Sequence, residues 1–244
     1  MGKHCKFINT PPINHLIKCL FVIASFILSA PVFANACYIK ILAGDYDQAL
    51  CTKAAEQGMA ESRYSLGLVY EHGRGTRINY QQAFYWYSLA AEQGHTEAQL
   101  NLGNLYNDGK GIRQSYKQAA YWYTKAAEKG YDKAQYNMGN MHAYARGTPE
   151  DYKQAVYWYT KAAEQGYAEA QLELGNKYYY GQGILKDSVL AYVWWHIAAT
   201  QGHENAAKNK GVLEQKMTPD QISEAKKLSK EYSAKYVITL VTLN

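Results

Sequence analysis

Residues 95–130 have the sequence HTEAQLNLGNLYNDGKGIRQSYKQAAYWYTKAAEKG, and this stretch decides the fold because its pattern returns along the chain at a fixed interval. Glycines at 58, 94, 130, 166 and 202 lie 36 residues apart, with no insertion between them. A constant period of this length is typical of stacked helical repeats. We therefore predict four full units, 59–94, 95–130, 131–166 and 167–202, preceded by an N-terminal capping half-repeat, 37–58, and followed by C-terminal capping helices and a tail, 203–244.

Each unit is predicted to form two helices, here called helix A and helix B. In the second unit, helix A begins near His95 and carries an apolar stripe that includes Leu102 and Leu105. It ends at the turn 108–111, where two glycines permit positive backbone angles. Helix B begins at the N-cap Ser115, whose capping-box partner is Gln118. The predicted fold class is all-α, a right-handed α/α solenoid with degenerate capping elements at both ends.

One glycine interrupts every helix A, at positions 67, 103, 139 and 175. Glycine inside a helix costs roughly 1 kcal/mol relative to alanine, so four in register require a close helix approach. We predict that the tryptophan of helix B, at 86, 122, 158 and 194, is the partner of this glycine. The tryptophans are then structural core and not a ligand site.

The ends of the array also have helical patterns. Residues 45–58 form a degenerate helix B. Thr218, Pro219 and Gln221 combine an N-cap, a proline at the first helical position and a capping-box glutamine, and they open a covering helix to about Tyr236.

The combined pattern resembles the Sel-one-like repeat, a relative of the tetratricopeptide repeats. It is Ala-x-x-x-Leu-Gly-x-x-Tyr-x-x-Gly-x-Gly, then Tyr-x-x-Ala-x-x-Trp-Tyr-x-x-Ala-Ala-x-x-Gly, and it covers 59–202. His142, Ala145 and Ser188 depart from it, which affects the turns and not the fold. The resemblance implies that helix A lines the concave side. It also implies an exported bacterial protein that binds other macromolecules, in envelope assembly, signalling or host contact.

The first 36 residues differ in composition from the rest. They contain three lysines, no acidic residue, and an uncharged run of 12 residues from Cys19 to Ala30. This is the pattern of a cleavable signal peptide, 1–36, with cleavage after Ala34 or Ala36. An uncleaved anchor is the alternative, although the run is shorter than a membrane span requires. We expect a periplasmic or secreted protein that meets the membrane only before cleavage.

Removal of the signal peptide leaves two cysteines, Cys37 and Cys51, and changes the net charge from +5 to +2, because three lysines leave. In an oxidising compartment the pair is predicted to form a disulfide. Lipidation of Cys37, or two buried thiols, are the alternatives. A nearly neutral chain gives no indication of nucleic-acid binding.

No catalytic, metal or cofactor site is predicted from the motifs. Ser223 to Lys226 match the Ser-x-x-Lys motif of penicillin-binding enzymes, but its companion motifs are absent. Without them, no small-molecule substrate is evident. An envelope enzyme, or a peptidoglycan- or β-lactam-binding protein, is the alternative to a non-enzymatic scaffold.

The predicted binding surface is a row of polar residues on helix A. Residues 3, 7, 10 and 14 of each unit share one face of the helix. Asparagine amides there both donate and accept, which suits the backbone of an extended peptide. An ordinary solvated surface is the alternative interpretation. The predicted contact residues for a protein or peptide are Asn101, Asn104, Asp108, Asn137, Asn140, Tyr144, Glu173, Asn176 and Tyr180.

Overall fold

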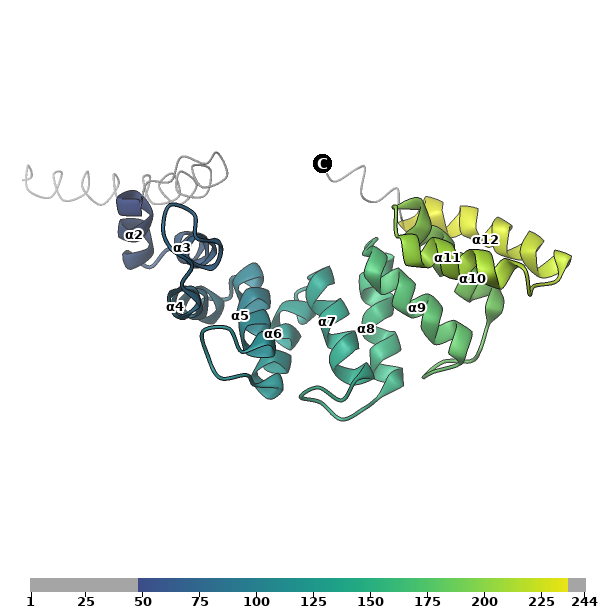
Figure 1. Cartoon of the computed structure of the whole chain (residues 1–244), viewed down its shortest axis with the longest axis horizontal. Helices are drawn as coiled ribbons and strands as arrows, with labels where there is room; N and C mark the ends of the chain where they lie inside the picture. Colours follow the sequence, from purple (N-terminus) through teal and green to yellow (C-terminus); the bar gives the residue numbers. More distant parts are fainter. Residues whose placement is uncertain (1–47, 237–244) are drawn as a thin grey trace, which may run out of the picture.

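The computed structural model describes residues 48–236, and this part of the chain is helical with no strand. The signal segment 1–36, Cys37 and the tail 237–244 lie outside the described residues. Four helix pairs follow one another along a curved superhelix (Figure 1), which confirms the all-α repeat prediction. The pairs are α3 (Ala60–His72) with α4 (Tyr80–Glu92), α5 (Thr96–Asp108) with α6 (Tyr116–Glu128), α7 (Asp132–Ala143) with α8 (Tyr152–Glu164), and α9 (Ala168–Tyr180) with α10 (Ser188–Thr200).

Every helix B begins at a side-chain cap. Asn79, Ser115, Asp151 and Asp187 each accept a hydrogen bond from the backbone N–H three residues further on, at 2.9–3.3 Å. These bonds satisfy N–H groups that have no partner within the helix. The predicted starts of helix B are therefore confirmed.

The ring that packs against the helix A glycine is not the predicted tryptophan, so that prediction was wrong. A Cβ atom at Gly139 would lie 2.4 Å from the ring of Tyr159, which is the residue after Trp158. Successive residues on a helix point about 100° apart, so only one of the two can face the glycine. The tryptophan instead packs against the preceding pair, as Trp158 does against the α5–α6–α7 core. The matching contacts are Gly67 with Tyr87, Gly103 with Tyr123 and Gly175 with Trp195.

The turn between helix A and helix B packs against the preceding repeat. At Gly147, φ is +75°, and a Cβ atom there would lie 2.2 Å from the Tyr116 carbonyl oxygen. Gly111 and Gly183 make the same close approach to the preceding helix B. Ala145 adopts a left-handed φ of 52° where other units have glycine, and α7 ends at Ala143. The departure is therefore local and leaves the period intact.

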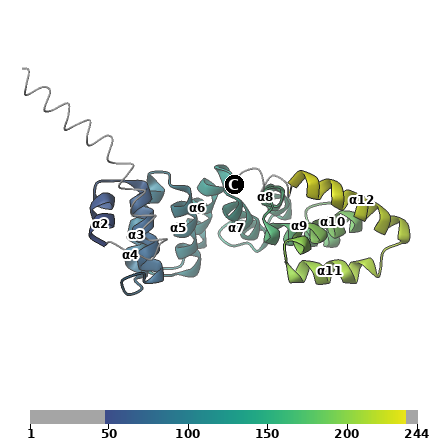
Figure 2. The ribbon, with the colours of Figure 1, turned by 90° about the horizontal axis from the view of Figure 1, so that it is seen from above.

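The array ends in different ways at its two termini. At the front, α2 (Gln48–Glu56) packs on α3, with Cys51 fully buried. At the back, α11 (Glu204–Glu214) and α12 (Pro219–Tyr236) both pack on α10, and they diverge on either side of it (Figure 2). Thr218 and Gln221 form the predicted capping box at 3.0 and 3.2 Å. Among residues 48–236, no helix is long and apolar enough to cross a membrane.

Candidate partner-binding site

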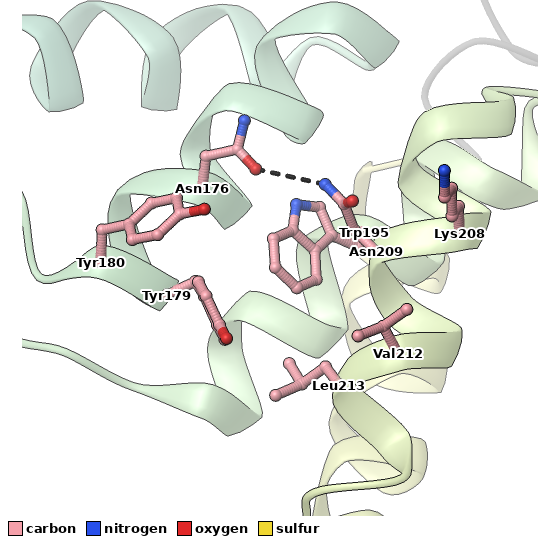
Figure 3. A pocket seen from close by; sticks show the side chains of 8 residues that line it. All are labelled: Asn176, Tyr179, Tyr180, Trp195, Lys208, Asn209, Val212 and Leu213. Atoms are coloured by element: carbon pink, nitrogen blue, oxygen red, sulfur yellow. Dashed lines mark hydrogen bonds between the residues drawn. The ribbon is translucent and has the colours of Figure 1, made fainter.

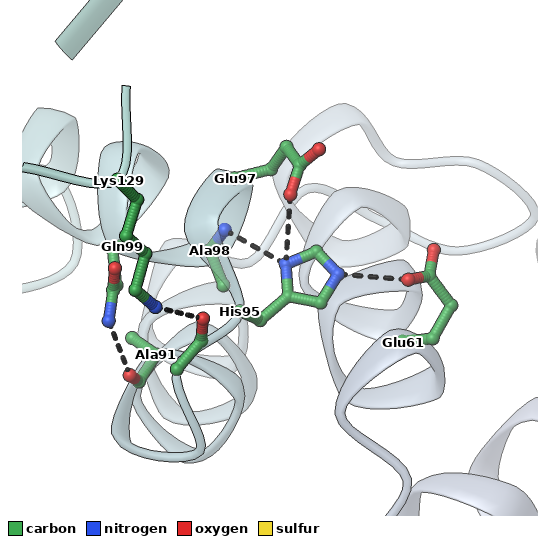
Figure 4. Close-up of polar contacts among 8 residues, drawn as sticks. Glu61, Ala91, His95, Glu97, Ala98, Gln99 and Lys129 are labelled. Carbon is green, nitrogen blue, oxygen red and sulfur yellow. Dashed lines mark hydrogen bonds and ion pairs between the residues drawn. The ribbon is translucent and has the colours of Figure 1, made fainter. Parts of the chain in front are cut away.

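Buried glutamines, which were not among the predicted contact residues, join α5, α7 and α9 to the preceding helix B. The side-chain amide of Gln99 donates to the carbonyl oxygen of Ala91 at 3.0 Å (Figure 4). Gln135 and Gln171 make the same bond at 3.2 and 3.1 Å. These bonds satisfy carbonyl groups at the end of helix B, where intrahelical partners run out. The sequence contains the pattern that could have predicted these bonds, because the three glutamines also lie 36 residues apart.

His95 is a second contact between repeats. Its Nδ1 accepts from the N–H of Ala98 at 3.3 Å, and its Nε2 lies 2.9 Å from Oε2 of Glu61 on α3 (Figure 4). The ring stacks on Tyr64, with centroids 4.5 Å apart. His95 therefore caps α5 and holds it against α3, which is a structural role.

Two of the predicted contact asparagines accept hydrogen bonds from buried tyrosines. The hydroxyl of Tyr123 donates to Oδ1 of Asn104 at 2.8 Å, and that of Tyr159 donates to Oδ1 of Asn140 at 2.7 Å. Burial raises the pKa of both phenols well above the usual range, so they remain protonated and need an acceptor. Asn104 and Asn140 therefore belong to the polar row and also help to hold helix B against helix A.

Asparagine side chains of the row meet at two boundaries between neighbouring repeats. The amide of Asn137 lies 3.5 Å from Oδ1 of Asn104, and Asn209 on α11 lies 3.5 Å from Asn176. These distances are at the long limit for hydrogen bonds, so the contacts are weak. A ligand that offers stronger partners can therefore compete for these amides.

Two hollows lie at the C-terminal end of the row. The larger, of about 650 Å³, lies between α7 and α9 and includes Tyr144, Glu173, Asn176 and Tyr180 in its lining. The smaller, of about 170 Å³, lies between α9 and α11 against Trp195, and it shares Asn176 and Tyr180 with the larger (Figure 3). The side chains of Tyr144 and Tyr180 are 56% and 66% exposed. Four of the nine predicted contact residues therefore meet in one place.

The other predicted residues lie outside these hollows. Asn101 and Asn137 are half-buried on α5 and α7. Asp108 is exposed at the end of α5 and pairs with Lys110 at 2.8 Å. Burial alone would raise the pKa of Asp108, but hydrogen bonds from Lys110 and Asn107 hold it below the usual value.

Lys177, which was not among the predicted contact residues, lines the larger hollow. Lys177 is only 5% exposed and stands where Val69, Leu105 and Met141 occupy the core of the other units. Its ammonium donates to Oε1 of Gln182 at 2.9 Å and lies 4.7 Å from the centre of the Tyr152 ring. Burial lowers the pKa of this lysine. The sequence already marks this residue as unusual, because a lysine interrupts the apolar residues found at this position in the other units.

The remaining chemical candidates do not form a site. Ser223 and Lys226 are exposed on α12, and the Lys226 ammonium pairs with Glu214 at 3.2 Å. Within residues 48–236, no cluster of three His, Cys, Asp or Glu side chains could hold a metal ion. The two hollows with their tyrosines are the strongest candidate site.

These features define an α-solenoid of paired helices with a polar row on its helices A. The chain belongs to the Sel1 repeat family, whose model matches residues 60–95, 96–131, 132–167 and 168–203. These units begin one residue later than the predicted ones.

Two solved structures resemble the chain over most of its length. A Sel1 repeat protein from Oxalobacter formigenes is 32% identical with a TM-score of 0.70, over 80% of this chain and 84% of that one. A protective antigen present in uropathogenic Escherichia coli strains is 30% identical with a TM-score of 0.57, over 89% of this chain. The match spans 56% of the antigen's length. No curated protein matches the chain.

Proposed function

We propose that this protein is a non-enzymatic scaffold that binds a peptide or protein segment along the helix A row, with the two hollows as the anchoring point. Sel1 repeats are scaffolds that generally bind proteins and are typically non-catalytic. A solenoid suits this role because its stacked units present an extended surface without a deep active site.

The observation that carries the proposal is the pair of adjacent hollows that share Asn176 and Tyr180. Polar groups and exposed tyrosine rings in one lining are typical of sites that hold a side chain and the backbone beside it. Tyrosine contributes a large rigid contact area with few rotatable bonds, so little entropy is lost on binding. The weakly bonded amide of Asn176 is available to the ligand backbone.

The charges around the larger hollow select among ligands. Arg146, Glu150, Glu173 and Lys177 all line it, so cationic and anionic groups balance. A ligand with a strong net charge of either sign would be repelled by two of these four charged groups. We therefore propose an uncharged or charge-balanced segment that carries an apolar or aromatic side chain.

We further propose that the protein acts outside the cytoplasm, in the periplasm or after release. The signal-peptide pattern of residues 1–36 supports export. The similarity to the uropathogenic antigen supports, by analogy, a role in contact with a host.

The test is selection from a random dodecapeptide display library with the intact chain, followed by affinity measurement on the enriched peptides. The double variant Tyr144→Ala/Tyr180→Ala should bind them at least ten times more weakly. Both side chains are more than half exposed, so circular dichroism should show unchanged helix content. Unchanged affinity in this variant would exclude the hollows as the site.

The control is Tyr121→Ala on helix B. Tyr121 is 51% exposed and lies away from both hollows, so this variant should bind as the parent chain does. Equal losses in both variants would indicate non-specific tyrosine contacts. Alanine at all four of Asn101, Asn104, Asn137 and Asn140 is a poorer test, because it also removes the acceptors of Tyr123 and Tyr159.

A further inference from the structure

Gly211 is a fifth member of the helix A glycine series. It follows Gly175 by 36 residues, as Gly175 follows Gly139. It lies on α11, where Leu213 is buried as Leu105 is on α5. By register, α11 is therefore the helix A of a fifth unit.

The helix B of this fifth unit is missing from the described residues. After α11 the chain turns back, and α12 packs on α10 (Figure 2). There Tyr232 and Tyr236 contact Trp194, with ring centroids 5.5 and 5.7 Å apart. At the four earlier glycines, a Cβ atom would lie 2.3–2.6 Å from an aromatic ring of helix B. At Gly211, no neighbouring atom of residues 48–236 lies within 4 Å of that position.

The residues around Gly211 suit an aromatic ring. Val212 is 48% exposed, and Lys208 is exposed beside it. Lys208 has the register of Tyr136, whose ring contacts that of Tyr159 in the complete third unit at 6.0 Å. A lysine there can lay its aliphatic stem along a ring and its ammonium over the ring face.

We propose that this face of α11, formed by Lys208, Gly211 and Val212, docks a helix from another protein, and that a tyrosine or tryptophan of that helix seats on Gly211. The occupant is argued from continuity, because the same glycine–ring interface forms four times within the chain, with tyrosine three times and tryptophan once.

A second copy of the chain is a poor occupant. Its four complete helices B already hold their rings against their own glycines. In α2 the register of the ring is taken by Cys51, which is fully buried. The docked helix is therefore foreign, and its face shares Lys208 and Val212 with the lining of the smaller hollow but no residue with the larger one.

The probe is a fluorescein-labelled peptide of residues 151–166, which contains the whole of α8 with its cap. Fluorescence anisotropy with the intact chain should show saturable binding. Gly211→Leu fills the vacant position and should weaken binding at least tenfold, as should Tyr159→Ala in the peptide. Asn205→Leu adds the same side chain elsewhere on α11 and should leave binding unchanged.

Three results would overturn the proposal: no saturable binding, equal affinity for Gly211→Leu, or a concentration-dependent dimer in sedimentation that Gly211→Leu abolishes. The last would assign the face to a second copy. Tyr144 lines only the larger hollow, so Tyr144→Ala should weaken binding of the library peptides and still bind the α8 peptide, which makes failure of the proposed groove and failure of this face distinguishable.

Discussion

At the scale of single residues, the departures from the repeat show where the structure tolerates variation. Ala145 keeps a left-handed backbone where Gly73, Gly109 and Gly181 stand in the other units. The neighbouring repeats fix the turn, so an alanine is held in a conformation that costs roughly 1–2 kcal/mol. Lys177 is a different kind of departure, because it places a charge in an otherwise apolar position beside a hollow.

The first prediction concerns Ala145. Ala145→Gly should raise the free energy of unfolding by about 0.5–1 kcal/mol, because relief of the left-handed strain exceeds the added entropy of the unfolded chain. Urea denaturation followed by circular dichroism measures the change. Ala207→Gly is the control at an exposed helical position, and it should lower stability by about 0.5–1 kcal/mol. A loss of stability in both variants would contradict the assignment of strain to Ala145.

At the scale of elements, the helix pair is defined by a glycine on one helix and an aromatic ring on the other. Tyr159 is fully buried and donates to Asn140, so its ring has little freedom to move. The corresponding glycine on α11, Gly211, has no ring against it in the part of the chain that the structure describes. A larger side chain would therefore collide with a ring at Gly139 on α7, whereas it has room at Gly211 on α11.

Two alanine substitutions test this contrast. Gly139→Ala should destabilise the protein by about 1–3 kcal/mol or more, since its Cβ atom would collide with the Tyr159 ring at 2.4 Å. Gly211→Ala should leave stability unchanged or raise it by up to about 1 kcal/mol, because alanine is the better helix former and the space is open. Thermal unfolding measures both. Similar losses in the two variants would show that α11 is already covered.

At the scale of the whole molecule, the repeats share one architecture and the two ends differ. Within residues 48–236, the front is a short helix that buries Cys51, and the back is a helix A without its helix B. Each unit of a solenoid is stabilised by packing against its neighbours, and a terminal unit has only one neighbour. A covalent bridge at the front would compensate for that loss.

Export and the bridge are predicted together. Expression of the full chain in a bacterium should yield a mature protein that begins at Asn35 or Cys37, as N-terminal sequencing will show. Its intact mass should increase by about 2 Da on reduction, for the two hydrogens that a Cys37–Cys51 disulfide takes up. A lipid-sized mass increment on Cys37, or retention of residues 1–36, would contradict the prediction.

The sequence by itself determined the period, the helix boundaries and the family. Each of these depends on local rules, namely caps such as Ser115, turn glycines and apolar spacing, which act within one unit. It also indicated four residues of the candidate site, because helical spacing places Glu173, Asn176 and Tyr180 on one face of helix A, and Tyr144 has the position of Tyr180 in the preceding unit.

Only the tertiary structure decided which aromatic ring meets the helix A glycine and which asparagines are tied to buried hydroxyls. The same holds for the turn of α12 back onto α10, which leaves Gly211 open. The reason is physical: these outcomes depend on the relative rotation and approach of two helices. That geometry is set by side-chain packing between elements, and the periodicity within one helix does not record it.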